Sequence, residues 1–128
     1  MFNSKRNEGK DSSCQKGRTG EDIAADYMIG QGLRILSKNF RASCGEIDII
    51  ALDGKELVFV EVKARRTGEF GIGADSVGYY KQKKITNTAE LYLNMTKVKY
   101  KSCRFDVASV DLRTNSVVEY VRDAFEAL

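Results

Sequence analysis

The most informative segment of the chain is Gly45–Arg65, GEIDIIALDGKELVFVEVKAR. Two runs rich in β-branched residues flank Asp53-Gly54-Lys55-Glu56, a combination that predicts a β-hairpin with a tight turn. If Asp53 and Glu56 close that turn, even positions of the first strand share a face with odd positions of the second. Asp48 is then expected directly opposite Glu61, with Lys63 one step along the same face.

The two faces of the predicted hairpin differ in polarity. One face is expected to be wholly apolar and holds Ile47, Ile49, Ala51, Val58, Val60 and Val62. The other face is polar at the end away from the turn and apolar near the turn, and it holds Glu46, Asp48, Ile50, Leu52, Leu57, Phe59, Glu61 and Lys63.

The carboxylates of Asp48 and Glu61 have two interpretations. Ionised carboxylates beside apolar surface are costly unless they are paired or bind a cation. Two of them about 5 Å apart on neighbouring strands repel each other, and a hard divalent ion such as Mg²⁺ or Mn²⁺ relieves that repulsion. Lys63 then fits as the group that orients or deprotonates an attacking water. The other interpretation is a salt bridge from Lys63 to either acid at a sheet edge.

The segments around the hairpin predict a mixed sheet with helices packed on it, an α/β fold. Residues 1–16 are expected to be a flexible leader, and residues 17–128 a single domain. Apolar spacing predicts helices and strands, and glycines mark their ends and one loop. In order we expect a helix from Thr19 to Gly30, a strand over Arg34–Phe40, the hairpin, a glycine-rich loop over 66–73, a helix over Ala74–Met95, strands over Ser102–Leu112 and Ser116–Val121, and a helical segment over Asp123–Leu128.

Composition excludes several classes of protein. The chain has 128 residues, 42% of them hydrophobic, with a mean hydropathy of −0.38. No stretch approaches the roughly 20 apolar residues that span a bilayer, and the polar N-terminus has no signal-peptide core, so a cytoplasmic protein without membrane contact is expected. The absence of histidine excludes Ser-His-Asp triads. Three cysteines without C-x-x-C spacing argue against a disulfide framework or a zinc site.

Positive charge is concentrated in the middle of the chain. Lys63–Arg104 contains ten basic and three acidic residues, a net +7, against +3 for the whole chain. Such a segment suits a polyanionic partner such as nucleic acid, because phosphate contacts supply most non-specific affinity. A solvated helix face is the alternative that charge alone leaves open.

Asp48 and the Glu61-Val62-Lys63 run resemble the active-site signature of the PD-(D/E)XK nuclease superfamily, with Ile47 in place of the proline before the aspartate. More closely, the chain resembles the YraN-like family of predicted bacterial endonucleases, which is related to archaeal Holliday-junction resolvases. The resemblance covers about residues 17–110. Its matching pieces are Gly17, Gly20-Glu21, Ala24, Tyr27, Asn39, Arg41, Gly45–Asp48, Ile50-Ala51, Val58–Lys63, Arg65, Val77, Lys81, Ala89, Tyr92-Leu93 and Arg104–Val107.

The resemblance implies a restriction-endonuclease-like core, with a central mixed sheet flanked by helices. It also implies that Asp48 and Glu61 bind the metal, that Lys63 places the nucleophilic water, and that an acid on the first helix, here Glu21, completes the catalytic site. Glu21 shares a helical face with Ala25 and so borders the core-facing stripe. Its alternative role is to interact with the dipole of the helix N-terminus.

Several further residues are assigned from their positions. Lys81 lies on the apolar stripe of the predicted helix over Ala74–Met95. It is expected either to contact a phosphate or to lay its alkyl chain along apolar surface with its ammonium in solvent. Arg65, Arg66 and Lys84 are assigned with Lys81 to substrate binding. Glu46 is expected next to the metal or one shell away, and Asp106 is expected to pair with Arg104 or a lysine. Tyr79 and Tyr80 could stack on bases or line a partner interface, and we expect core packing.

We therefore expect an endonuclease dependent on Mg²⁺ or Mn²⁺ that hydrolyses DNA by in-line attack on phosphorus, with branched or otherwise structured DNA as the favoured substrate. Dimerisation is a hypothesis by analogy with the resolvases, because symmetric cutting of two strands needs two sites related by a twofold axis. The first alternative is a nucleic-acid-binding module of the same fold without turnover. The second is a small structural domain whose acidic cluster is salt-bridged.

Overall fold

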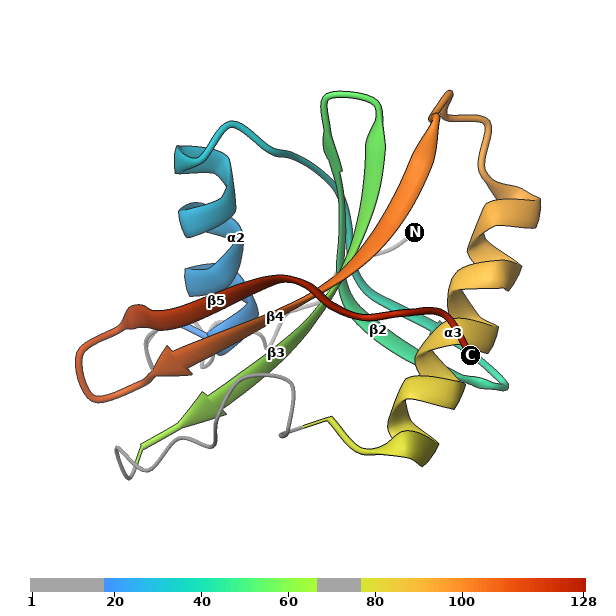
Figure 1. Cartoon of the computed structure of the whole chain (residues 1–128). Helices are drawn as coiled ribbons and strands as arrows, with labels where there is room; N and C mark the ends of the chain where they lie inside the picture. The colour runs from blue at the N-terminus through green and yellow to red at the C-terminus, as the bar shows by residue number, and fades with distance from the viewer. Residues whose placement is uncertain (1–17, 67–76) are drawn as a thin grey trace, which may run out of the picture.

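The computed structural model describes residues 18–66 and 77–128 (Figure 1). The predicted leader over residues 1–16, and the predicted glycine-rich loop beyond residue 66, lie outside the described residues. In chain order the elements are α2 (Gly20–Gly30), β1 (Arg34–Ala42), β2 (Gly45–Asp53), β3 (Glu56–Arg65), α3 (Tyr79–Met95), β4 (Ser102–Asp111) and β5 (Ser116–Phe125).

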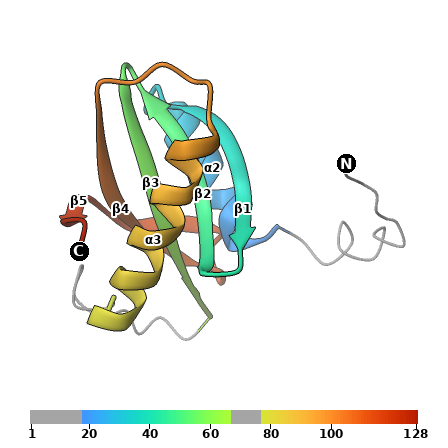
Figure 2. The same cartoon turned by 90° about the vertical axis from the view of Figure 1, so that its right-hand side faces the viewer.

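The five strands form one mixed sheet in the order β1-β2-β3-β4-β5. β3 and β4 run parallel, and the other neighbouring pairs are antiparallel. A parallel pair needs a crossover connection, and α3 lies in the one between β3 and β4. α2 covers one face of the sheet and α3 the other (Figure 1 and Figure 2). The expected α/β class, a mixed sheet with helices packed on it, is confirmed.

Each helix closes its own hydrophobic core against the sheet. β3 contributes to both cores, because its successive residues point to opposite faces and five of them in a row are buried. The core under α2 contains Ile23, Ala24, Ala25, Met28, Ile49, Ala51, Val58, Val60, Ala108 and Val110. The core under α3 contains Ile47, Ile50, Leu57, Phe59, Val77, Ile85, Ala89, Phe105 and Val107.

The predicted hairpin is confirmed, including Asp53 and Glu56 as its closing pair. Its two-strand ladder continues only as far as Ile49 and Val60, so the strands separate before the level of Asp48 and Glu61. The expectation that Ile47 shares a face with Ile49 is wrong, because Ile47 packs in the core under α3. The regular alternation of β2 therefore breaks at Asp48.

β1 departs from a regular strand at the same level. Phe40 and Lys38 pair with the two neighbours of Asp48, and Asn39 between them has a φ of 58°. Asparagine tolerates this left-handed conformation better than most residues. The irregularity thus affects both strands at the point where the acidic residues lie.

The first helix begins and ends as expected. The Thr19 side chain accepts a hydrogen bond from the Asp22 main-chain N–H, and the Asp22 carboxylate accepts one from the Thr19 N–H, a capping box. Gly20 lets the helix start lie close to β3, because a Cβ at this position would lie 2.7 Å from the Ala64 Cβ. This close approach brings Glu21, the next residue, to the end of the hairpin.

The second helix begins at Tyr79 rather than at Ala74 as predicted. Val77 packs in the core ahead of the helix, and Gly78 is extended with a ψ of 173°, so helical hydrogen bonding starts only after it. Residues 74–76 lie outside the described part of the chain. The apolar stripe itself packs as predicted.

The predicted helix over Asp123–Leu128 is not formed, because β5 extends to Phe125 and residues 126–128 are neither helix nor strand. The Asp123 main-chain N–H donates to the buried Asp106 carboxylate at 2.9 Å, and the Phe125 ring stacks on Phe105. These long-range contacts override the local helical pattern. Asp106 also accepts from Arg104 Nε at 3.0 Å, so the predicted pairing of these two residues is confirmed.

Neither helix in the described residues is long and apolar enough to cross a membrane.

Candidate functional site

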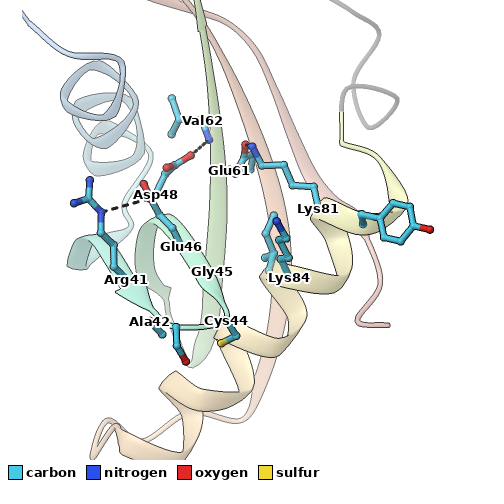
Figure 3. Close-up of a pocket in the computed structure, with 13 residues that line it drawn as sticks. Arg41, Ala42, Cys44, Gly45, Glu46, Asp48, Glu61, Val62, Lys81 and Lys84 are labelled. Carbon is cyan, nitrogen blue, oxygen red and sulfur yellow. Dashed lines mark hydrogen bonds and ion pairs between the residues drawn. The ribbon is translucent and has the colours of Figure 1, made fainter.

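The site begins where β2 and β3 separate. The Asp48 carboxylate accepts a hydrogen bond of 2.7 Å from the Val62 main-chain N–H (Figure 3). A side chain thus supplies the acceptor that the next main-chain carbonyl of a regular ladder would supply. This bond fixes the half-buried Asp48 carboxylate beside β3.

Glu61 lies on the face of the sheet that α3 covers. Its side chain is 7% exposed, and its carboxylate forms an ion pair of 2.6 Å with Lys81 Nζ, which reaches it from α3 (Figure 3). The bond to Glu61 is the main reason that the pKa of Lys81 is raised above its ordinary value. The ammonium of Lys81 therefore stays charged and neutralises one of the site's acids.

The electrostatics of Asp48 are those of a crowded acidic site. Burial, followed by the negative charges of Glu61, Glu21 and Glu46, raises the pKa of Asp48 to about 7, although the bond from Val62 opposes this shift. Four carboxylates from two strands and one helix thus act on one another. A cation placed among them would be stabilised by several negative charges at once.

Lys63 lies two residues beyond Glu61 on β3, on the same face by alternation. Burial, together with the positive charges of Arg65 and Lys81, lowers the pKa of Lys63, while the charge of Glu61 opposes the change. A lysine with a lowered pKa loses its proton more readily than an exposed one and so can accept a proton from water.

An open cleft of about 880 Å³ gives access to this site. It lies between the β1–β2 turn, the separated ends of β2 and β3, and the first turns of α3 (Figure 3). Glu46, Asp48 and Glu61 are its acidic residues, and Arg41, Lys81 and Lys84 are its cationic ones. The lining residues are Arg41, Ala42, Ser43, Cys44, Gly45, Glu46, Asp48, Glu61, Val62, Tyr80, Lys81, Lys84 and Ile85.

The structure brings together some of the predicted site residues and leaves others at its margin. Asp48, Glu61, Lys81 and Lys84 line one cleft. Glu21 and Lys63 do not line it, although the charge of Glu21 helps to raise the pKa of Asp48 and the charge of Glu61 acts on Lys63. Arg65 and Arg66 also lie outside the lining, exposed at the end of β3, where Arg65 Nη1 donates to the neighbouring Ala64 carbonyl.

The sequence alone does not predict that the β1–β2 turn forms one wall of the cleft. Arg41 forms an ion pair of 3.4 Å with Glu46 across this turn. Gly45 packs so closely on α3 that a Cβ would lie 2.8 Å from Thr88 Oγ1. The pattern that could have predicted this turn is a short hairpin with opposite charges on its two strands. Its contact with α3 is a tertiary contact, which no local sequence pattern predicts.

Tyr79 and Tyr80 do not pack in the core, so that expectation is wrong. Their exposed fractions are 63% and 81%. Both residues precede the first buried turn of α3, because the helix starts later than predicted. Tyr80 lines the cleft.

A divalent ion would have few protein ligands in this site. Among residues 18–66 and 77–128, no group of three or more His, Cys, Asp and Glu side chains is arranged to hold a metal ion. Mg²⁺, however, commonly keeps several waters and binds through one or two carboxylates together with substrate phosphates. Asp48 and Glu61 fit that mode of binding, and the raised pKa of Asp48 indicates a place where a cation would relieve repulsion.

Comparison with known proteins identifies relatives over nearly the whole chain. Residues 20–110 match the family described as "Uncharacterised protein family UPF0102". A UPF0102 protein of Geotalea daltonii is 42% identical over 123 residues, which cover 94% of this chain and 97% of the relative. UPF0102 proteins of Dictyoglomus thermophilum (42%, covering 85% of this chain and 95% of the relative) and Syntrophus aciditrophicus (43%, covering 89% and 91%) are similar. The matched residues include every element that carries the cleft.

Proposed function

The chain belongs to the uncharacterised protein family UPF0102, and from this premise we propose that it is a metal-dependent endonuclease that hydrolyses DNA phosphodiester bonds. The observation that carries the proposal is one cleft lined by three carboxylates, among them Asp48 and Glu61, and by three cationic side chains. The third carboxylate is that of Glu46, and the cations are Arg41, Lys81 and Lys84. An acidic centre with a basic surround suits a cation at the centre and a phosphate backbone across it.

The finer assignment is to the PD-(D/E)XK nucleases and, among them, to the YraN-like endonucleases related to Holliday-junction resolvases. Asp48, Glu61 and Lys63 stand at the positions of that signature. The mixed sheet with a helix on each face agrees with the restriction-endonuclease-like core that the resemblance implies. Both points support the assignment.

Asp48 and Glu61 would hold Mg²⁺ or Mn²⁺. When bound, the ion polarises the scissile phosphate and lowers the pKa of water next to it. The hydrogen bond from the Val62 N–H already orients the Asp48 carboxylate. The Glu61 carboxylate would be free to bind the ion once the Lys81 ammonium had left it. Glu21 adds negative charge from the α2 side, which strengthens the attraction for a cation.

In the proposed reaction Lys63 accepts a proton from the attacking water. The water oxygen attacks phosphorus in line with the leaving oxygen, the phosphorus–oxygen bond on the far side breaks, and the leaving oxygen is protonated by solvent. Lys81 and Lys84 contact phosphates within the cleft, whereas Arg65 and Arg66 contact the backbone beyond it. The lowered pKa of Lys63 suits the role of general base.

A second candidate is a nucleic-acid-binding module of the same fold without turnover. The ion pair between Lys81 and the buried Glu61 favours it, because the ammonium already occupies the Glu61 carboxylate. In that case the cationic surround binds phosphates while the acids are neutralised inside the protein.

The test is cleavage of labelled linear and four-way-junction DNA in Mg²⁺ or Mn²⁺. We expect the wild type to cut and Glu61→Gln to lose at least the roughly 100-fold that weakened metal ligation costs. Glu90→Gln makes the same chemical change on the exposed side of α3, outside the cleft, and should cut like the wild type. DNA binding that weakens with salt, without cutting by the wild type, would select the binding module. No binding to DNA would contradict both functions.

A further inference from the structure

Tyr80 is the most exposed of the large hydrophobic residues that the described part of the chain leaves at its surface. It is 81% exposed at the start of α3, and it lines the cleft. The ring of Tyr79 meets it edge-on, with centroids 5.5 Å apart and planes at 80°. This contact limits the positions of the Tyr80 ring, while most of its surface stays open to solvent.

The neighbours of Tyr80 in the cleft include two lysines, whose charge suits a phosphate group. Lys81 follows it in the chain and reaches the Glu61 carboxylate at 2.6 Å. Lys84 lies one helical turn further along and lines the same cleft. An aromatic face beside two lysines is the combination with which proteins hold single-stranded nucleic acid, the ring stacking on a base and the cations on its backbone.

The base that stacks on Tyr80 must be unpaired. In a continuous duplex each base is already stacked on both sides and paired at its edge, so a side chain reaches its face only after the base leaves the stack. A ring on the wall of the cleft that also holds Asp48 and Glu61 therefore favours DNA in which a nucleotide is free, as at a junction, a flap or a single strand.

We propose that Tyr80 is a specificity-determining residue that stacks on an unpaired base of the DNA bound in the cleft, so that the cleft selects DNA with unpaired nucleotides over continuous duplex. This inference rests on the proposed function, because the nucleotide it places is part of the proposed substrate.

The test is DNA binding in EDTA, where no cutting occurs. A single-stranded oligonucleotide that carries 2-aminopurine, and the same sequence as a duplex, are titrated with the wild type, Tyr80→Ala, Tyr80→Phe and Tyr100→Ala. Tyr100 is the matched control, since it is 38% exposed and lies outside the cleft, before β4. Because the Tyr80 side chain is so exposed, Tyr80→Ala should fold like the wild type, which thermal denaturation checks.

We expect Tyr80→Ala to weaken single-strand binding by roughly 5- to 150-fold, the range of one lost base–aromatic stack, and to abolish the quenching of 2-aminopurine. Duplex binding should stay nearly unchanged, Tyr80→Phe should bind and quench like the wild type, and Tyr100→Ala should do the same. Equal losses for single strand and duplex, or no loss at all, would overturn the proposal. So would a change in oligomeric state without a change in DNA binding, which would make Tyr80 part of a protein interface.

Cleavage in Mg²⁺ separates this inference from the proposed function. Metal-dependent cutting together with binding that is insensitive to Tyr80→Ala would overturn the inference alone. Stacking that depends on Tyr80, without any metal-dependent cutting, would support the inference for binding and contradict the endonuclease.

Discussion

Asp48 is held by one favourable interaction against several unfavourable ones. The Val62 N–H favours its ionised form, whereas burial and the charges of Glu61, Glu21 and Glu46 disfavour it more strongly. A protein keeps such an arrangement at a cost in stability, and strongly shifted carboxylates of this kind are typical of functional sites. The cost should be measurable.

The first prediction concerns Asp48→Asn, which keeps an acceptor for the Val62 N–H but cannot ionise. Asp48 loses its proton near pH 3.8 in the unfolded chain and at about pH 7 in the folded chain. Between these pH values the folded state binds the extra proton, so the free energy of unfolding of the wild type should fall as the pH rises. Above pH 7 Asp48→Asn should therefore be more stable than the wild type by roughly 2 kcal/mol. This figure is about half of what the pKa change implies, because solvent screens the partly exposed side chain.

Urea denaturation in EDTA at several pH values measures this difference. The stability advantage of Asp48→Asn should shrink as the pH is lowered toward 4. Glu90→Gln, which removes one exposed negative charge, serves as the control. An advantage that does not change with pH, or a variant less stable than the wild type at about pH 8, would show that Asp48 is not under this strain.

Individual residues were predictable where the regular ladder of the hairpin extends, as with its closing pair Asp53 and Glu56. The expected position of Asp48 directly opposite Glu61 is not observed, because the ladder ends at Ile49 and Val60. Tyr80 was misplaced because its exposure depends on where α3 begins, and Gly78 delays that start in a way that helical spacing cannot reveal. The bond from Val62 to Asp48 was also beyond prediction, since it exists only because the ladder stops early.

At the scale of elements, β4 and β5 are joined by a buried polar network. Asp106 is fully buried and accepts from Arg104 Nε, from the Tyr120 hydroxyl at 2.6 Å and from the Asp123 N–H. Burial and the bond to Asp106 raise the pKa of Tyr120, so its hydroxyl remains a donor. Arg104 also contacts Asp53 and Glu56, which ties the network to the hairpin turn.

The second prediction is that Asp106→Ala destabilises the fold by about 3 kcal/mol, because it removes the fully buried one of the three carboxylates that contact the Arg104 cation and leaves two further donors without an acceptor. Asp26→Ala removes the exposed ion pair between Arg18 and Asp26 and should cost about 1 kcal/mol or less. Urea denaturation compares the two. Equal effects would mean that the network contributes no more than a surface pair.

The elements were predictable in kind and less so in extent. β-branched runs and the Asp53-Gly54 turn identify the hairpin, because both signals are local. The final segment was assigned to a helix, since neither the bond from Asp123 to Asp106 nor the stacking of Phe125 on Phe105 is visible in a local window. Within the described residues, long-range contacts therefore explain why residues 123–125 lie in a strand where a helix was predicted.

At the scale of the molecule, the cleft is a product of topology. The parallel step from β3 to β4 requires a crossover, and α3 in that crossover lies against the face where Glu61 points. Its first turns thereby bring Tyr80, Lys81 and Lys84 to the acids of the hairpin. The concentration of positive charge between Lys63 and Arg104 was visible in the sequence, but the folding of that charge around an acidic centre was not.

Whether Asp48 and Glu61 hold a metal can be measured by calorimetric titration of Mn²⁺ into the wild type, Glu61→Gln and Glu90→Gln, which requires no choice of DNA substrate. We expect the wild type to have a site that Glu90→Gln retains and that Glu61→Gln weakens by roughly 10- to 100-fold. No binding by the wild type, or equal binding by Glu61→Gln, would contradict the assignment of Asp48 and Glu61 as metal ligands.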